Sequence, residues 1–194
     1  IFLKKRLMVK KIAVFSSGRG GNFNNICEYF KAVKNISVDL LVTNNLNSMS
    51  KKIADTNNVD SFYADKAVML SGQLNKVLEE RGVDLVVLAG YIIKIPEILV
   101  NEYEKKIINL HPSLLPKYGG KGMYGDNVHK AVLKHKERYT GITIHYVDEV
   151  YDNGEIIFQK MCDVNLDESL ASLREKIRQL EYEFFPKTIE KLLS

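Results

Sequence analysis

The chain alternates between short apolar runs and longer segments in which apolar residues recur every three or four positions. The apolar runs are rich in β-branched residues and predict five strands, at 11–17, 38–44, 59–64, 84–90 and 106–112. The segments between them predict helices, and the inward stripe of the helix before the fourth strand is expected at Leu70, Leu74, Val77 and Leu78. Strands that alternate with helices are typical of a mostly parallel, doubly wound α/β sheet with helices on both faces.

The pattern changes after residue 140, where two further apolar stretches flank a polar loop. GITIHYV and EIIFQKMCDV enclose DEVYDNG, and its Asn153-Gly154 pair is a turn signal, so we expect an antiparallel pair of strands. A long final helix is predicted from the spacing of Leu170, Leu173, Ile177, Leu180 and Phe184. Pro186 is expected to kink or end it, because proline has no backbone N–H. The predicted fold class is a Rossmann-like α/β sheet with an antiparallel C-terminal strand excursion.

Composition limits the domain organisation and the partners. With 194 residues, of which 45% are hydrophobic, the chain can bury one substantial core, so we expect a single domain over 11–194. Lys and Arg total 28 against 24 Asp and Glu, but five of these cations lie in the first eleven residues. We interpret residues 1–10 as a basic, poorly ordered leader. It is too short, and too poor in aromatic residues, to indicate a nucleic-acid or membrane partner.

Export and membrane insertion are not predicted. No apolar segment with a cleavage site follows the N-terminal charges, and no window approaches 18 apolar residues. Cys27 and Cys162 stand far apart and belong to no CxxC or metal-ligand cluster. We therefore expect a cytoplasmic protein with two reduced, buried thiols and no bound metal.

The loop after the first strand is a candidate phosphate site, because ligands of open parallel sheets bind outside the carboxyl ends of the strands. It reads SSGRGGNFNN and sets Gly18, Gly20 and Gly21 before a helix, where backbone N–H groups can approach an anion. It is not a Walker loop, and a GxGxxG pattern fails at Phe23. A phosphate-bearing small molecule fits better than a dinucleotide, and a tight turn without a ligand is the alternative.

The end of the fifth strand is the candidate catalytic position. Asn109 and His111 lie two residues apart and so project from the same face, and Pro112 restricts the chain directly after them. An amide donor beside an imidazole suits stabilisation of charge on a carbonyl oxygen, which indicates acyl transfer. A histidine satisfied by its neighbours is the alternative. Ser113 is a candidate nucleophile, but no G-x-S-x-G elbow is present, so direct attack by a substrate amine is simpler.

Five motifs occur in an order that resembles a known family. They are VFSSGRGGN, VVLAGYI, INLHPSLLPKYGGKGMYG, GITIHYVDEVYDNGEII and LEYEFFP. From about Lys11 to the C-terminus the chain resembles the phosphoribosylglycinamide formyltransferases, folate-dependent enzymes of purine synthesis. The most specific part is Asn109-x-His111-Pro112-Ser113, followed about forty residues on by Asp152-x-Gly154.

The resemblance implies a set of site residues. Asn109, His111 and Asp152 would be catalytic, with Asp152 raising the pKa of His111 from its usual value of ~6.5. The ribonucleotide would bind Gly20, Gly21, Asn22, Arg178 and Glu181. The formyl donor, 10-formyltetrahydrofolate, would contact Ile92, Ile93, Lys94, Ile95, Asn109, Asp148, Glu149, Val150, Tyr151 and Asp152.

The chain departs from the resemblance at two places. Many relatives have an arginine that reaches the folate before the third helix, whereas this chain has none between Arg19 and Arg81. Gly21 stands where relatives commonly have serine, which removes a hydroxyl but leaves the backbone amide. The missing arginine bears on folate affinity and on contacts to the glutamate tail.

Three other functions compete with this interpretation. A methionyl-tRNA formyltransferase would add a C-terminal RNA-binding domain, and a formyltetrahydrofolate hydrolase would use the same three residues with water as acceptor. A non-catalytic nucleotide-binding module is the alternative from another class, and the Asn, His and Asp constellation argues against it. We expect small-molecule substrates and a monomer or homodimer.

Overall fold

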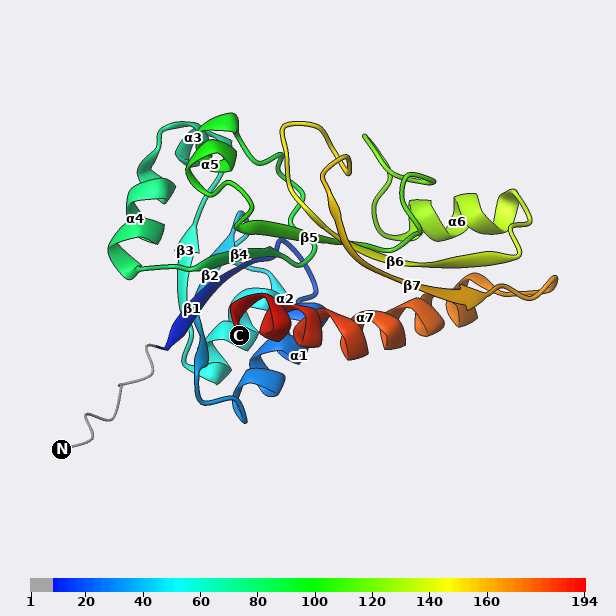
Figure 1. The fold of residues 1–194 in the computed structure, drawn as a ribbon, viewed down its shortest axis with the longest axis horizontal. Coiled ribbons are helices and arrows are strands. Elements are labelled where there is room, and N and C mark those ends of the chain that lie inside the picture. The colour runs from blue at the N-terminus through cyan, green and yellow to red at the C-terminus, as the bar shows by residue number, and fades with distance from the viewer. Residues whose placement is uncertain (1–8) are drawn as a thin grey trace.

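The computed structural model describes residues 9–194, which form one seven-stranded sheet (Figure 1). Its strands are β1 (Lys10–Phe15), β2 (Ile36–Thr43), β3 (Asp60–Tyr63), β4 (Leu85–Leu88), β5 (Ile107–His111), β6 (Tyr139–Tyr146) and β7 (Ile156–Asp163). They lie in the order β3-β2-β1-β4-β5-β6-β7, and β1 to β5 are parallel whereas β6 and β7 run antiparallel to their neighbours. The predicted fold class is confirmed.

Helices cover both faces of the sheet. They are α1 (Gly21–Phe30), α2 (Met49–Asn57), α3 (Lys66–Leu70), α4 (Gln73–Arg81), α5 (Glu97–Glu102), α6 (Asp126–Lys134) and α7 (Leu170–Leu193). In Figure 1, α1, α2 and α7 lie against one face, and α3, α4 and α5 lie against the other. Successive residues of β1 alternate between two apolar clusters: Ile12 and Val14 pack with α1 and α7, and Ala13 and Phe15 pack with α4 and α5. The sheet is therefore a central layer with a core on each side.

The predicted leader falls mostly outside the described residues. Residues 1–8 lie outside them, and Lys10 belongs to β1. Its ammonium group lies 2.8 Å from the Asp84 carboxylate, and Asp84 also accepts the Lys11 backbone N–H at 2.8 Å. The division into a leader and a single domain stays a prediction.

The predicted stripe of the helix before β4 is wrong at Leu70. Leu74 and Leu78 are fully buried, but the Leu70 side chain is 60% exposed. The segment forms two helices, because Gly72 adopts φ +74° and caps the start of α4. This interruption changes the phase of the helical repeat, so Leu70 does not share a face with the residues of α4.

The final helix continues through Pro186, so of the two outcomes expected for this proline, an end of the helix is wrong and a kink stays a prediction. α7 runs to Leu193. A proline at this position leaves the carbonyl of Tyr182, four residues earlier, without its helical donor. The Asn25 side-chain amide of α1 donates to that carbonyl at 2.8 Å. The hydrogen bond between helices thus replaces the one that proline removes, and Pro186 itself is buried against the core.

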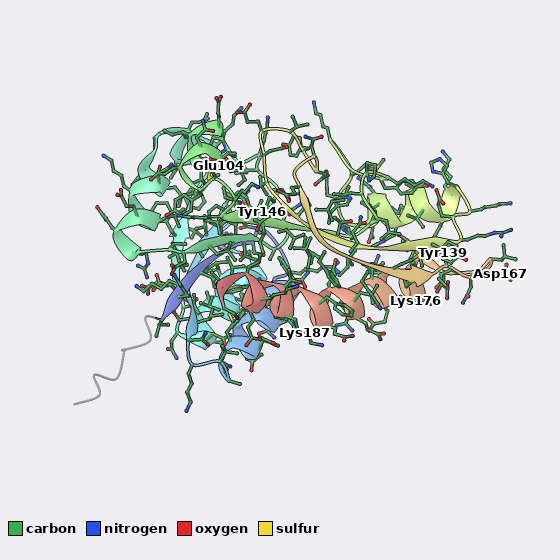
Figure 2. All side chains as sticks on the ribbon, viewed as in Figure 1. Glu104, Tyr139, Tyr146, Asp167, Lys176 and Lys187 are labelled. Carbon is green, nitrogen blue, oxygen red and sulfur yellow. The ribbon has the colours of Figure 1, made fainter. Side chains whose placement is uncertain are left out.

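The antiparallel strands β6 and β7 are joined by a loop, residues 147–155, that lies beside β5. β6 runs from Tyr139 at the far end of the sheet to Tyr146 beside β5 (Figure 2). A Cβ atom on Gly154 would lie 1.9 Å from the Tyr146 carbonyl oxygen, so only glycine permits this close approach. The loop between β6 and β7 is thereby held against the sheet. Among residues 9–194, no helix combines the length and apolar character needed to cross a membrane.

Both cysteines are free thiols. Cys27 is buried on α1, and burial raises the pKa of its thiol to about 12. Cys162 on β7 is only partly buried, so the expectation of two buried thiols holds for one of them.

Candidate active site

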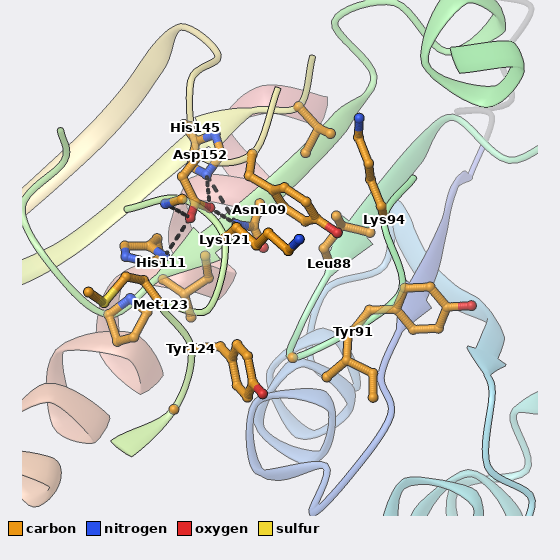
Figure 3. A pocket seen from close by; sticks show the side chains of 18 of the residues that line it. Leu88, Tyr91, Lys94, Asn109, His111, Lys121, Met123, Tyr124, His145 and Asp152 are labelled. Atoms are coloured by element: carbon orange, nitrogen blue, oxygen red, sulfur yellow. Dashed lines mark hydrogen bonds and ion pairs between the residues drawn. The ribbon is translucent and has the colours of Figure 1, made fainter. Parts of the chain in front are cut away.

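A cavity of about 650 Å³ opens at the carboxyl ends of β4 and β5, beside the start of α1 (Figure 3). Most residues expected at the site line it: Asn22, Ile92, Ile93, Lys94, Ile95, Asn109, His111, Asp148, Val150, Tyr151, Asp152 and Glu181. The other four, Gly20, Gly21, Glu149 and Arg178, do not form its wall. The cavity therefore gathers segments that are far apart in the sequence.

β5 presents the two candidate catalytic side chains to the cavity. Asn109 and His111 alternate with Ile108 and Leu110, which pack into the core on the opposite face of the sheet. His111 is buried with 3% of its surface exposed. The period of two that predicted a shared polar face is confirmed.

Asp152 joins these two residues from the loop between β6 and β7. One carboxylate oxygen, Oδ2, accepts the Gly120 backbone N–H at 2.8 Å and lies 3.5 Å from His111 Nδ1. The other, Oδ1, accepts from the Asn109 amide nitrogen at 3.4 Å. Figure 3 shows Asp152 between the two β5 residues. Asp152 adopts φ +54°, a conformation that aspartate and asparagine tolerate better than most residues.

His111 has a defined tautomer in its neutral form. Its Nε2 lies 2.8 Å from the Tyr118 carbonyl oxygen, which can only accept, so Nε2 carries the proton. Nδ1 then faces Asp152 with a lone pair, and a second proton at Nδ1 would bridge the two groups. Burial lowers the pKa of His111 and outweighs the raising effects of Asp152 and the Tyr118 carbonyl. The predicted net rise in this pKa is therefore wrong, because its derivation left out desolvation.

The pKa of Asp152 lies below its usual value. Burial alone would raise it, but the interactions with His145 and His111 and the hydrogen bond from the Gly120 amide together outweigh burial. The carboxylate is therefore ionised at neutral pH while the imidazole of His111 is mostly neutral. A proton that enters the site at Nδ1 would form the hydrogen-bonded ion pair.

His145 is a residue of the site that the sequence analysis missed. It pairs with Asn109 across β5 and β6. Its Nδ1 donates to the Tyr146 carbonyl at 2.8 Å, so in the neutral ring Nε2 accepts from the Asn109 amide at 3.1 Å. One amide hydrogen of Asn109 thus points to His145 and the other to Asp152. Only the register of β6 on β5 would have revealed this contact.

The start of α1 forms the second part of the site. Gly20 adopts φ +70° and precedes the first free amides of the helix. The Asn22 side chain donates to Glu181 of α7 at 2.9 Å, and its own oxygen is buried without a hydrogen-bond partner in the described part of the chain. Burial raises the pKa of Glu181 to about 7, although Asn22 and Arg178 oppose the rise. Arg178 is exposed and pairs with Glu175 at 2.7 Å.

The loop after β4 forms an apolar wall with fixed backbone. The Ile92 N–H donates to the Ser17 hydroxyl at 3.1 Å, and the Tyr91 hydroxyl donates to the Ala64 carbonyl at 2.9 Å. Lys94 lies 5.8 Å from the centre of the Tyr151 ring, so a cation and an aromatic ring meet at the cavity mouth. Such a wall suits a flat, apolar ring system with polar edges.

The residues that line the cavity without having been predicted include Arg19 and His129. Arg19 is exposed beside Asn22 and adds a cation near the start of α1. His129 of α6 is buried, and its Nδ1 has no hydrogen-bond partner among residues 9–194. No group of three or more His, Cys, Asp or Glu side chains in those residues is arranged to hold a metal ion.

Comparison with known families agrees with this geometry. Residues 10–189 match the family described as formyl transferase. The chain belongs to the formyl transferase family. The match includes β1 to β7 and most of α7, and so covers every element that contributes to the cavity.

Individual relatives in the formyl transferase family are named phosphoribosylglycinamide formyltransferases. The chain is 40% identical over 187 residues to the chloroplastic protein of Arabidopsis thaliana, covering 93% of this chain and 64% of that one. The Bacillus subtilis relative is 35% identical over 192 residues, with 95% of each chain covered. The Anaplasma phagocytophilum crystal structure superposes with a TM-score of 0.87 at 30% identity, over 95% of this chain and 87% of that one. The chain spans less than two thirds of the length of the two plant relatives, 64% and 61%.

Proposed function

We propose that this formyl transferase moves the formyl group of 10-formyltetrahydrofolate to the amine of 5'-phosphoribosylglycinamide, in purine synthesis. The observation that carries the proposal is the position of Asp152, between Asn109 and His111 and in the same cavity as the start of α1. This arrangement provides acyl-transfer chemistry beside an anion site. The names of the relatives support the choice of substrates. The cytoplasmic location and the monomer or homodimer state stay predictions.

Asn109 stabilises the oxyanion that forms when the amine attacks the formyl carbon. One of its amide hydrogens is held by His145 at 3.1 Å, which fixes the plane of the group. The other lies in a long hydrogen bond of 3.4 Å to Asp152, which is weaker than an ordinary one. The developing negative charge on the formyl oxygen takes over this second hydrogen. The amide therefore binds the transition state better than the ground state.

The His111–Asp152 pair holds the proton that the reaction moves. Attack forms a C–N bond to the amine and breaks the bond between the formyl carbon and N10 of the folate. The amine loses one proton and N10 gains one, so no net proton is released. His111 Nδ1 can accept that proton because Asp152 Oδ2 lies 3.5 Å away to stabilise the imidazolium. The resulting cation also adds a positive charge beside the oxyanion.

The two substrates would occupy opposite ends of the cavity. The free amides of α1 would hold the ribonucleotide phosphate, and Glu181 would accept from sugar hydroxyls. The folate ring would lie against Ile92 to Ile95, with its polar edge towards the loop from Asp148 to Asp152. This order places the amine and the formyl carbon next to Asn109 and His111.

The test is to mix the purified protein with both substrates and follow loss of the formyl donor by absorbance. We expect donor loss only when the ribonucleotide is present. Equal consumption in its absence would identify a hydrolase, which uses water as acceptor. Binding of the ribonucleotide without any turnover would identify a non-catalytic module.

A further inference from the structure

The start of α1 has no side chain of its own to complete an anion site. α1 begins at Gly21, and the Gly20 cap makes no side-chain hydrogen bond. The amides of the first turn are free, since they have no partner within the helix. Neither glycine can add a hydroxyl donor beside them.

The phenol of Tyr182, on α7, lies at this position. A Cβ atom added to Gly21 would lie 2.6 Å from Tyr182 Oη. Two covalent bonds of about 1.5 Å separate such an atom from the backbone nitrogen, so the hydroxyl lies within about 5.6 Å of the Gly21 nitrogen. A phosphate bound to this amide therefore has the Tyr182 hydroxyl as its neighbour.

Neighbouring groups hold Tyr182 in place. The Tyr182 carbonyl accepts from Asn25 at 2.8 Å, which ties this turn of α7 to α1. The Arg178 guanidinium lies 5.1 Å from the centre of the phenol ring. A phenol carries one O–H donor, which can turn toward a bound anion.

A second observation points to a ligand at the same place. The Asn22 side-chain oxygen is buried and has no donor within the described chain. Buried polar atoms are normally hydrogen-bonded, so the missing donor is expected from a bound molecule. A sugar phosphate offers an anion for the amides and hydroxyl donors for this oxygen.

We propose that the Tyr182 hydroxyl donates a hydrogen bond to the phosphate of the ribonucleotide and so determines the affinity for phosphorylated substrates. The inference rests on the proposed function, because the phosphate belongs to that substrate. The Tyr182 hydroxyl takes the place of the hydroxyl that a serine at position 21 would have. A side chain at position 21 and the Tyr182 phenol cannot both occupy this space unless the phenol moves away, because a Cβ there would lie 2.6 Å from Tyr182 Oη. Arg178, next to the phenol, adds positive charge on the same side.

The test compares KM values for the ribonucleotide and for its dephosphorylated riboside. Hydrogen bonds to charged groups are among the stronger ones, so Tyr182→Phe is expected to raise the ribonucleotide KM about tenfold. The KM for the folate, the kcat and the KM for the riboside should stay near their wild-type values. Tyr29→Phe is the matched control, because its hydroxyl also lies between α1 and α7, donating to Glu190 at 2.5 Å, but Tyr29 is eight residues, more than two helical turns, beyond Gly21 along α1. It should leave the ribonucleotide KM unchanged.

The double variant Gly21→Ser with Tyr182→Phe returns a hydroxyl to the site from α1. Its ribonucleotide KM is expected to be lower than that of Tyr182→Phe and within about threefold of the wild-type value. The serine hydroxyl is the group that would restore this affinity. An unchanged KM in Tyr182→Phe, an equal rise for ribonucleotide and riboside, or no recovery in a folded double variant would each overturn the inference. If the wild-type protein does not formylate the ribonucleotide at all, the proposed function fails and the inference fails with it.

Discussion

Replacing Asp152 by asparagine removes one charge from the centre of the site and one acceptor, that of the long hydrogen bond from Asn109. The Asp152 carboxylate lies 3.5 Å from His111 Nδ1. Opposite unit charges at this separation attract each other by about 4 to 5 kcal/mol at an effective dielectric constant of about 20. This attraction is available only when His111 takes up a proton during the reaction. Most of the loss should therefore appear in the transition state.

We expect kcat to fall about 10² to 10³-fold in Asp152→Asn, which corresponds to about 2.7 to 4 kcal/mol. Both KM values should change much less. Asparagine tolerates the φ of +54° at this position, and its side-chain oxygen can still accept from Gly120. The melting temperature should therefore shift by no more than about 2 to 4 °C, the change expected for about 1 kcal/mol in a protein of this size. The exposed Asp167 provides the control substitution Asp167→Asn, which should alter neither quantity.

A double variant tests whether the two residues act together. If Asp152 works by stabilising protonated His111, then adding Asp152→Asn to His111→Asn should cost much less than the product of the single losses. Steady-state kinetics of the four proteins provide the measurement. Near-native turnover in Asp152→Asn, or losses in kcat that simply multiply, would refute the coupled mechanism.

Three further predictions concern the groups around the site. Burial raises the pKa of Glu181 to about 7, so the protonated side chain favours the folded state and the ionised one opposes it. The stability contributed by protonated Glu181 is fully present below pH 4.5 and is lost as pH rises through 7. Glu181→Gln should therefore raise the melting temperature more at pH 8 than at pH 5, and an equal shift at both would contradict the pKa. Gly20→Ala should lower the melting temperature and raise the ribonucleotide KM, because φ at this position is +70° and the added Cβ would lie 2.9 Å from the α2 backbone. The control is Gly18→Ala, whose Cβ would meet no atom within 4 Å and which should change neither quantity. Gly154→Ala, whose Cβ would lie 1.9 Å from the Tyr146 carbonyl oxygen, should lower kcat by displacing the loop of Asp152, and wild-type kcat would show that the loop tolerates the change.

Local sequence patterns predicted the strands and the face of β5 correctly because their physical causes are local. The alternation that places Asn109 and His111 together depends only on the two-residue repeat of a strand. The glycines at 18, 20 and 21 likewise predicted a helix start, whereas an anion bound there stays a prediction. These features need no knowledge of the rest of the chain.

Features that depend on distant residues could not be predicted in the same way. His145 joins the site through the register of β6 on β5, and Pro186 stays within α7 because Asn25 of another helix replaces the lost hydrogen bond. Asp152 was expected at the site from family resemblance, whereas its spacing alone predicts a turn. The lowered pKa of His111 follows from burial, which only the packed structure reveals.

The most direct test of the central claim follows the formyl carbon itself. The donor, labelled with ¹³C at the formyl group, is incubated with the protein and 5'-phosphoribosylglycinamide, and the products are analysed by NMR. The account predicts that the label appears in formylglycinamide ribonucleotide, in an amount equal to the donor lost. Label that appears instead as formate, at the same rate with or without the ribonucleotide, would contradict it.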